Sequence, residues 1–122
     1  MLGAGLIAAA GSAAQKAALL GAVVEGKTLL AVAYAEPTSR YEPFNVQTRA
    51  AKTAGGFALS GHKCVVLNGG EADQLIVSAR DGGSPRDASG ISLFLVDPKA
   101  KGVRPQKLRD GRWRTCRRAV AR

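Results

Sequence analysis

The chain has 122 residues, which is enough for one domain and too short for most two-domain enzymes. Hydrophobic residues make up 46%, so the chain can build a packed core. Aromatic residues make up only 5%, which leaves few rings for stacking on single-stranded nucleic acid. The two cysteines, Cys64 and Cys116, have neither a metal-binding nor a CxxC spacing, so a disulfide scaffold is excluded and a reducing compartment is favoured.

The positive charge of the chain is concentrated near its C-terminal end. Residues 105–122 carry seven basic side chains and one acidic, which is +6 of the total charge of +9. Residues 1–104 carry 11 basic and 8 acidic side chains, as an ordinary mixed-charge domain does. The body of the chain therefore gives no reason to expect a nucleic-acid partner.

The N-terminal apolar stretch is too short to span a membrane. Residues 1–15 fall below the roughly 20 apolar residues that a spanning helix needs. They also lack the basic segment that precedes the apolar part of a signal peptide. We expect a cytoplasmic protein without a membrane partner.

The first 25 residues predict two short helices. Residues 2–10 are rich in Ala, Leu and Ile, and Gly11 offers an end point. Ser12 and Gln15 have the spacing of a capping box, which predicts the start of a second helix. Gly21 predicts the end of that helix.

From residue 28 onward the pattern is typical of β structure. Short apolar runs alternate with turns that contain glycine, as at Gly55-Gly56 and Gly69-Gly70. The predicted strands cover residues 28–36, 45–53, 57–60, 62–67, 74–80 and 90–96. Strands of this length and spacing predict a mostly antiparallel barrel or sandwich. The fold class is therefore α+β, with short N-terminal helices before the β structure.

Six short motifs occur in an order that resembles one known family. They are Glu36-Pro37, Gly55-Gly56, Gly61-x-Lys63, Asn68-Gly69-Gly70, Ala72-Asp73 and the strand at residues 90–96. In this order they resemble the middle β-domain of acyl-CoA dehydrogenases, over residues 2–103. Within that family, the runs at residues 33–37 and 65–68 look most like the small subunits of pimeloyl-CoA dehydrogenases.

The resemblance implies a fragment of a larger enzyme. Residues 1–25 would be the end of the helical N-terminal domain and residues 26–106 the middle β-domain, without the C-terminal helical domain. The implied activity is FAD-dependent oxidation of an acyl-CoA to a trans-2-enoyl-CoA, in fatty acid metabolism. Electrons would pass to an electron-transfer flavoprotein, and the enzyme would be a homo- or hetero-oligomer. The alternative is a non-catalytic small subunit that partners a homologous large subunit.

The resemblance also assigns ligand contacts to particular residues. It places Tyr34 and Ala35 along the edge of the flavin, and Val65, Val66 and Leu67 over its face. Ala35 stands where many members have Thr, Val65 where they have Trp, and Leu67 where they have Thr or Ser, so two side-chain hydroxyls are missing. Tyr41 replaces part of the usual Gly-Ser pair and is the expected substrate contact.

Several residues that invite a functional role have a simpler interpretation. His62 lies beside a turn and is expected on the surface, and Cys64 is expected to be a small buried residue. Glu36 could be a catalytic carboxylate, but its place before Pro37 favours a structural acceptor at a strand end. We expect no metal site. We also expect no catalytic residue on this chain, because the catalytic carboxylate of the family belongs to the missing domain.

The last segment, residues 107–122, fits neither a strand nor a helix pattern. Its sequence is rich in Arg with single Trp and Cys residues, which is typical of a GC-rich gene translated out of frame. A basic arm for nucleic acid or anionic lipid would have a similar composition. We interpret it as a non-native or disordered basic tail.

Overall fold

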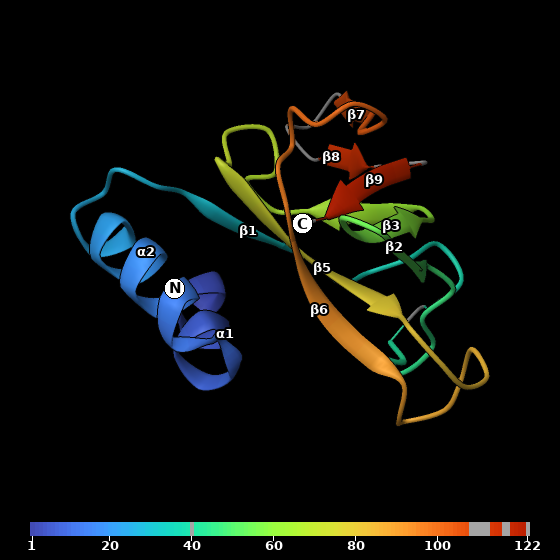
Figure 1. Ribbon diagram of the computed structural model, residues 1–122. Coiled ribbons are helices and arrows are strands. Elements are labelled where there is room, and N and C mark those ends of the chain that lie inside the picture. The colour runs from blue at the N-terminus through green and yellow to red at the C-terminus, as the bar shows by residue number, and fades with distance from the viewer. Residues whose placement is uncertain (40, 108–112, 116–117, 122) are drawn as a thin grey trace.

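The computed structural model describes residues 1–39, 41–107, 113–115 and 118–121. Two helices precede a β region, and Figure 1 shows the helices together on one side of the strands. The elements are α1 (Leu2–Ala10), α2 (Ala13–Val24), β1 (Leu30–Ala33), β2 (Arg49–Thr53), β3 (Gly56–Ser60), β4 (Lys63–Val66), β5 (Gln74–Arg80), β6 (Ile91–Val96), β7 (Pro105–Lys107), β8 (Trp113–Thr115) and β9 (Arg118–Ala121). No helix of the described part of the chain is long and apolar enough to cross a membrane.

The capping box predicted at Ser12 and Gln15 is confirmed. The Gln15 amide donates to the Ser12 hydroxyl, and the Ser12 amide donates to the side chain of Gln15. The predicted end at Gly21 is wrong, because α2 continues to Val24. One glycine inside a helix costs only about 1 kcal/mol. The helix ends instead where Gly26 takes the left-handed conformation, with a φ of 71°, that a helix C-terminus favours.

In the part of the chain that the structure describes, the main sheet is mixed and does not close into a barrel. In the described residues its strand order is β1-β5-β2-β3-β9. β1 pairs with residues 74–77 of β5 and β2 pairs with β5 at Arg80, while β6 pairs with β5 along residues 75–80. The β2–β3 and β5–β6 pairs are the expected antiparallel hairpins, but β1 runs parallel to β5 over Leu30–Ala33. The predicted antiparallel barrel or sandwich is therefore corrected. Parallel pairing needs a long connection, and here the chain passes through β2, β3 and β4 before it returns beside β1.

The hydrophobic core is built from side chains of several strands, and in β5 every second residue contributes to it. Leu75, Val77 and Ala79 of β5 face it, and Phe57 and Phe94 pack with their ring centroids 5.0 Å apart. On the other face of β5, Ile76 packs with α1 and Ser78 and Arg80 are buried among polar groups. The predicted strand at residues 74–80 is confirmed, and the structure shows that it is buried on both faces.

The C-terminal segment contributes backbone pairing to both sheets. β8 pairs with β4 and β7, and β9 pairs with β3 along Phe57–Ser60. Within the predicted tail, residues 108–112, 116–117 and 122 lie outside the described residues. The reading-frame interpretation of that tail stays a prediction.

Candidate functional site

The candidate site is the place where the end of β1 meets β4, which we call the β1–β4 edge (residues 34–36 and 63–67). The backbone amide of Cys64 donates to the carbonyl oxygen of Ala35 at 2.8 Å. This contact brings together two segments that are distant in the sequence and carry the five predicted cofactor residues. Their proximity follows from the tertiary fold, since neither segment predicts the other as its neighbour.

The edge exposes apolar side chains where a soluble surface normally has polar ones. Tyr34 is 58% exposed, Val65 44% and Leu67 69%. Ala35 is half-buried, and Val66 lies in the hydrophobic core. Any contact that Val66 makes with a ligand would therefore come from its backbone. Apolar side chains exposed beside one another are a feature of binding surfaces.

Val65 has a strained backbone. Its φ of 52° is in the left-handed region, which a β-branched side chain rarely adopts, and the pairing of β4 with β8 shifts register between Lys63 and Val66. Such strain costs on the order of 1–3 kcal/mol and is concentrated at functional sites. The bulge gives Val65 an exposed position between half-buried Cys64 and buried Val66.

A buried ion pair joins the two segments of the edge. Lys63 Nζ is 2.7 Å from Glu36 Oε1, and each side chain is only 2% exposed. Glu36 also accepts hydrogen bonds from the amide of Gln47 at 2.7 Å and from the amide and hydroxyl of Thr48 at 3.0 and 2.6 Å. Lys63 donates in addition to the Ser78 hydroxyl at 2.9 Å. All of these charges are therefore paired and hydrogen-bonded, as buried charges need to be.

The environment changes the acidity of both groups. Burial alone raises the pKa of the Glu36 carboxyl, but hydrogen bonds from Lys63, Thr48 and the Gln47 amide together outweigh it, so the pKa lies below the usual value. Burial lowers the pKa of the Lys63 ammonium, and the neighbouring Glu36 carboxylate only partly opposes that effect. With its oxygens engaged by four donors, Glu36 is the structural acceptor that its place before Pro37 predicts.

The other predicted residues have varied positions. His62 is exposed, as expected, whereas Cys64 is half-buried, so the expectation of a buried cysteine is only partly met because the β1–β4 edge lies open to solvent. Tyr41 is fully exposed in the loop that follows Glu36. Arg40, the residue before Tyr41, lies outside the described residues. No group of metal-ligating side chains occurs in the part of the chain that the structure describes.

Arg80, at the end of β5, is a residue that sequence reasoning missed. It is 3% exposed, and its five N–H groups lie within hydrogen-bond distance of six backbone carbonyl oxygens in two loops. The acceptors are Phe44, Val46, Gly82, Pro85, Asp87 and Ser89. An arginine at the end of a mostly apolar strand is the only signal in the sequence, and it does not reveal those partners.

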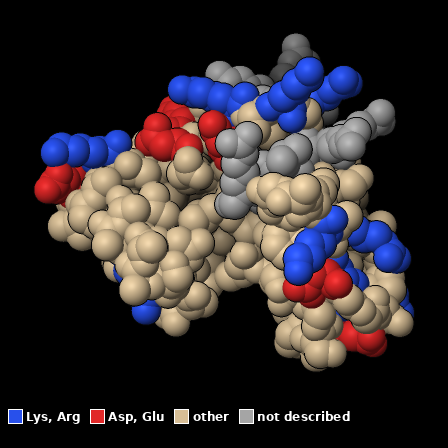
Figure 2. Space-filling view, viewed as in Figure 1, with Lys and Arg blue, Asp and Glu red and all other residues tan. Residues whose placement is uncertain are grey.

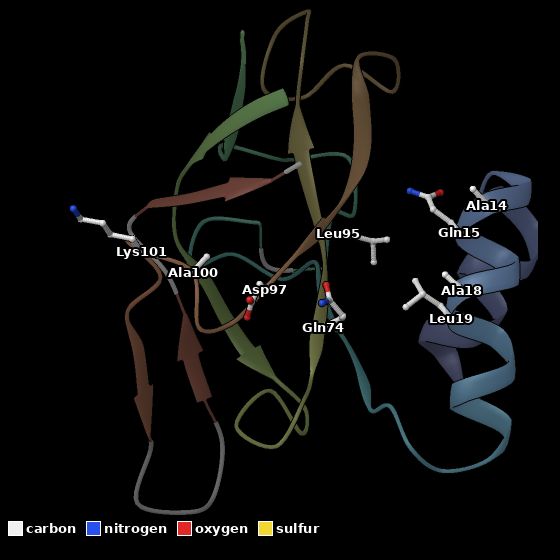
Figure 3. Close-up of a pocket in the computed structure, with 9 residues that line it drawn as sticks. All are labelled: Ala14, Gln15, Ala18, Leu19, Gln74, Leu95, Asp97, Ala100 and Lys101. Atoms are coloured by element: carbon white, nitrogen blue, oxygen red, sulfur yellow. The ribbon is translucent and has the colours of Figure 1, made fainter. Parts of the chain in front are cut away.

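A wide groove of about 840 Å³ lies elsewhere, between α2 and the β5–β6 pair. Figure 3 shows Ala14, Ala18 and Leu19 of α2 facing Leu95 across the groove, while the side chain of Lys101 points away. Apart from Asp97 and Lys101, its lining is uncharged. It contains no predicted site residue, so the β1–β4 edge is the better candidate.

The chain is similar to known acyl-CoA dehydrogenases in sequence. Residues 31–114 match the family "Acyl-CoA dehydrogenase, middle domain". The chain is 32% identical over 101 residues to the mitochondrial isovaleryl-CoA dehydrogenase of Pongo abelii, covering 82% of this chain and 24% of that protein. It is 38% identical over 87 residues to the mitochondrial long-chain specific acyl-CoA dehydrogenase of Rattus norvegicus, covering 68% of this chain and 20% of that protein.

Solved structures share the fold of this chain. A structure described as an electron transferring flavoprotein of Acidaminococcus fermentans superposes with a TM-score of 0.87 at 28% identity, covering 97% of this chain and 33% of that one. A probable acyl-CoA dehydrogenase from Mycobacterium abscessus has the same fold, with a TM-score of 0.85 at 23% identity, covering 94% and 32%. The chain belongs to the acyl-CoA dehydrogenase family. It spans about a quarter of the length of the curated relatives.

Proposed function

We propose that this chain supplies the β-domain part of the flavin and substrate site of an FAD-dependent acyl-CoA dehydrogenase. The intact enzyme would oxidise an acyl-CoA to the trans-2-enoyl-CoA. The observation that carries the proposal is the β1–β4 edge, where exposed apolar residues and a strained backbone meet in a member of this family. Functional sites are where exposed apolar surface and backbone strain are expected together.

The residues of the edge fit one face of a flavin ring. The apolar side chains of Val65 and Leu67 would cover the ring, and the backbone of Tyr34 and Ala35 would line its edge, with Val66 contributing through its backbone. Bound FAD would supply the group that accepts a hydride from the β-carbon of the acyl chain. Ala35 and Leu67 offer no hydroxyl, so recognition of the ring would depend on backbone groups and apolar contact.

We further propose that Tyr41 contacts the acyl-CoA substrate. Tyr41 is fully exposed in the loop between Glu36 and β2, so its ring is available to a ligand. The resemblance to small subunits of pimeloyl-CoA dehydrogenases suggests a dicarboxylyl substrate such as pimeloyl-CoA. Electrons would leave through an electron-transfer flavoprotein.

The base that removes the α-proton would come from outside this chain. Glu36, the one deeply buried carboxylate of the described residues, has both oxygens occupied by hydrogen bonds and faces Lys63. A general base needs a free lone pair within hydrogen-bond reach of the substrate. The purified chain with FAD, pimeloyl-CoA and a dye acceptor should therefore show no turnover. Turnover that disappears in Glu36→Gln would instead identify Glu36 as the base.

The cofactor assignment is tested by FAD binding to the purified chain. Val65→Glu places a charge on the proposed flavin face and should weaken binding about tenfold or more, since a desolvated unpaired charge is unfavourable. Leu93→Glu is the matched control, because Leu93 is 46% exposed on β6, against 44% for Val65. Fluorescence titration measures both. Equal effects of the two variants, or no FAD binding by the wild type, would contradict the proposal.

A second candidate function is that of a non-catalytic small subunit. The observation that favours it is the lack of hydroxyl side chains at Ala35 and Leu67, where the resemblance expects contacts to the flavin. In that case a homologous large subunit would carry the chemistry. Turnover that returns only when such a subunit is added to the purified chain would support this candidate over the first.

A further inference from the structure

We propose that Lys63, through its buried pair with Glu36, is the positioning residue of the β1–β4 edge. In this inference the pair holds the backbone of residues 34–35 against that of residues 64–65, so that both segments face one ligand. It rests on the proposed function for the identity of that ligand. Neither side chain of the pair touches the ligand itself, since each is only 2% exposed.

Lys63 connects three separate parts of the chain through one ammonium group. Its Nζ donates to Glu36 Oε1 at 2.7 Å, to the Ser78 hydroxyl on β5 at 2.9 Å and to the Tyr34 carbonyl at 3.5 Å. Tyr34 precedes Ala35, whose carbonyl accepts from the Cys64 amide. The lysine thus reaches across from β4 to the end of β1 at the place where the two segments meet.

Glu36 extends the same network to the segment before β2. Its carboxylate accepts from the amides of Gln47 and Thr48, and it fixes that segment behind the edge. The fit is close, because a Cβ added at Gly61 would lie 2.7 Å from the Thr48 Cα. Glycine at position 61 therefore lets the start of β4 approach the segment that Glu36 holds.

The energetics of buried ion pairs favour a role in geometry over one in stability. Replacing a buried pair by apolar groups of similar size is often neutral or stabilising, so the pair is weak support for a contribution to stability. What apolar groups cannot reproduce is a fixed direction of hydrogen bonding to Tyr34, Gln47 and Thr48. Edge residues that lie two positions from the pair, Tyr34 and Val65, depend on that direction.

The test compares Lys63→Met with the double variant Glu36→Gln/Lys63→Met and with Val96→Ala. The double variant has no unpaired buried charge, and Val96→Ala removes core packing on β6, which is not one of the two segments of the edge. Urea unfolding measures stability, titration measures FAD affinity, and amide hydrogen exchange by NMR reports on the Cys64 amide. We expect the double variant to regain most of the stability that Lys63→Met loses.

A positioning role predicts two effects that a purely stabilising role does not predict, one on FAD affinity and one on amide exchange. The double variant should still bind FAD about tenfold more weakly than the wild type and should exchange the Cys64 amide about tenfold faster. Val96→Ala should change neither FAD affinity nor the exchange of the Cys64 amide when it is compared with the double variant at the same free energy of unfolding. Wild-type affinity and protection in the double variant, or an equal loss in Val96→Ala, would overturn the inference. If the wild type fails to bind FAD, the proposed function fails, and the exchange of the Cys64 amide alone decides the positioning role.

Discussion

Val65 combines a branched side chain with a backbone conformation that favours glycine. Its φ of 52° falls within a register shift of β4, while its side chain lies partly open to solvent. The fold tolerates this strain because the neighbouring residues Lys63 and Val66 are buried and fixed. A residue held in this way at a proposed ligand surface is available for function at some expense in stability.

Replacing Val65 by glycine should make the chain more stable. Glycine removes strain of about 1–3 kcal/mol and loses about 0.4–1 kcal/mol through the unfolded chain, so the free energy of unfolding should rise by about 1 kcal/mol. Val32→Gly, in β1, has no strain to relieve and should lower the free energy of unfolding. Urea unfolding of both variants measures the difference, and a destabilised Val65→Gly would show that the strain is not stored at this residue.

Glu36 should make the stability of the chain depend on acid. Its pKa is lower in the folded chain than the ordinary value of 4.5, so the unfolded chain binds the proton more tightly. The contribution of Glu36 to stability is therefore complete above the unfolded pKa and is lost as the pH falls through the folded pKa. Glu36→Gln should flatten this acid limb of the free energy of unfolding.

The control for this titration is Glu42→Gln. The Glu42 carboxyl is largely exposed, and its contact with Arg86 is 4.0 Å long, so its removal should leave the acid limb in place. Urea unfolding at a series of pH values between about 2 and 7 compares the variants. The same acid limb in wild type and Glu36→Gln would assign the dependence to other carboxylates.

At the scale of elements, the contact between α1 and β1 depends on a small residue. Gly3 is buried, and a Cβ added there would lie 2.7 Å from the Leu30 Cβ, closer than real Cβ contacts allow. Ile7, one turn later, is buried beside it, so α1 lies directly on the strand. The closeness of helix and strand places β1 and the start of its edge relative to the sheet.

Gly3→Ala should separate this helix from the strand. The added methyl group overpacks the contact and should lower the free energy of unfolding by about 1–3 kcal/mol. Gly5→Ala, in the same helix, has nothing within 4 Å of the added Cβ, so it should raise the free energy of unfolding by up to about 1 kcal/mol. Opposite signs in thermal or urea unfolding are expected, and a stabilising Gly3→Ala would contradict the close contact.

At the scale of the whole molecule, the two helices expose an apolar surface. Figure 2 shows that the side formed by the helices carries few charged residues. Large apolar side chains are open there and at the start of β1, with Leu2 62%, Val24 88% and Leu29 49% exposed. A surface with few charges and several exposed apolar side chains favours contact with a partner.

We therefore expect the isolated chain to associate in solution. Covering a few hundred Å² of apolar surface is worth several kcal/mol at about 25 cal/mol per Å², comparable to the stability of a small domain. Light scattering coupled to size-exclusion chromatography should give a mass that rises with concentration, and Val24→Lys should reduce it. A sharp monomer with cooperative unfolding at all concentrations would count against this expectation.

Local features of the chain could be determined from the sequence because their causes are local. The capping box at Ser12, the hairpin turn at Gly55-Gly56 and the extended conformation of β5 each depend on residues close together in the chain. The six ordered motifs likewise identified the family from sequence alone. Such local signals fail where two of them compete, as when Gly21 predicted the end of α2 although the helix continues to Val24 and ends before Gly26.

What only the tertiary structure decided is which distant segments meet. The parallel pairing of β1 with β5 replaced the expected antiparallel barrel, because strand spacing constrains hairpins but not the return of the chain after a long connection. The same return places Lys63 on Glu36, the Cys64 amide on Ala35 and the Arg80 guanidinium on two loops. These partners are chosen by three-dimensional proximity and by the requirement that every buried charge be satisfied, neither of which a linear pattern records.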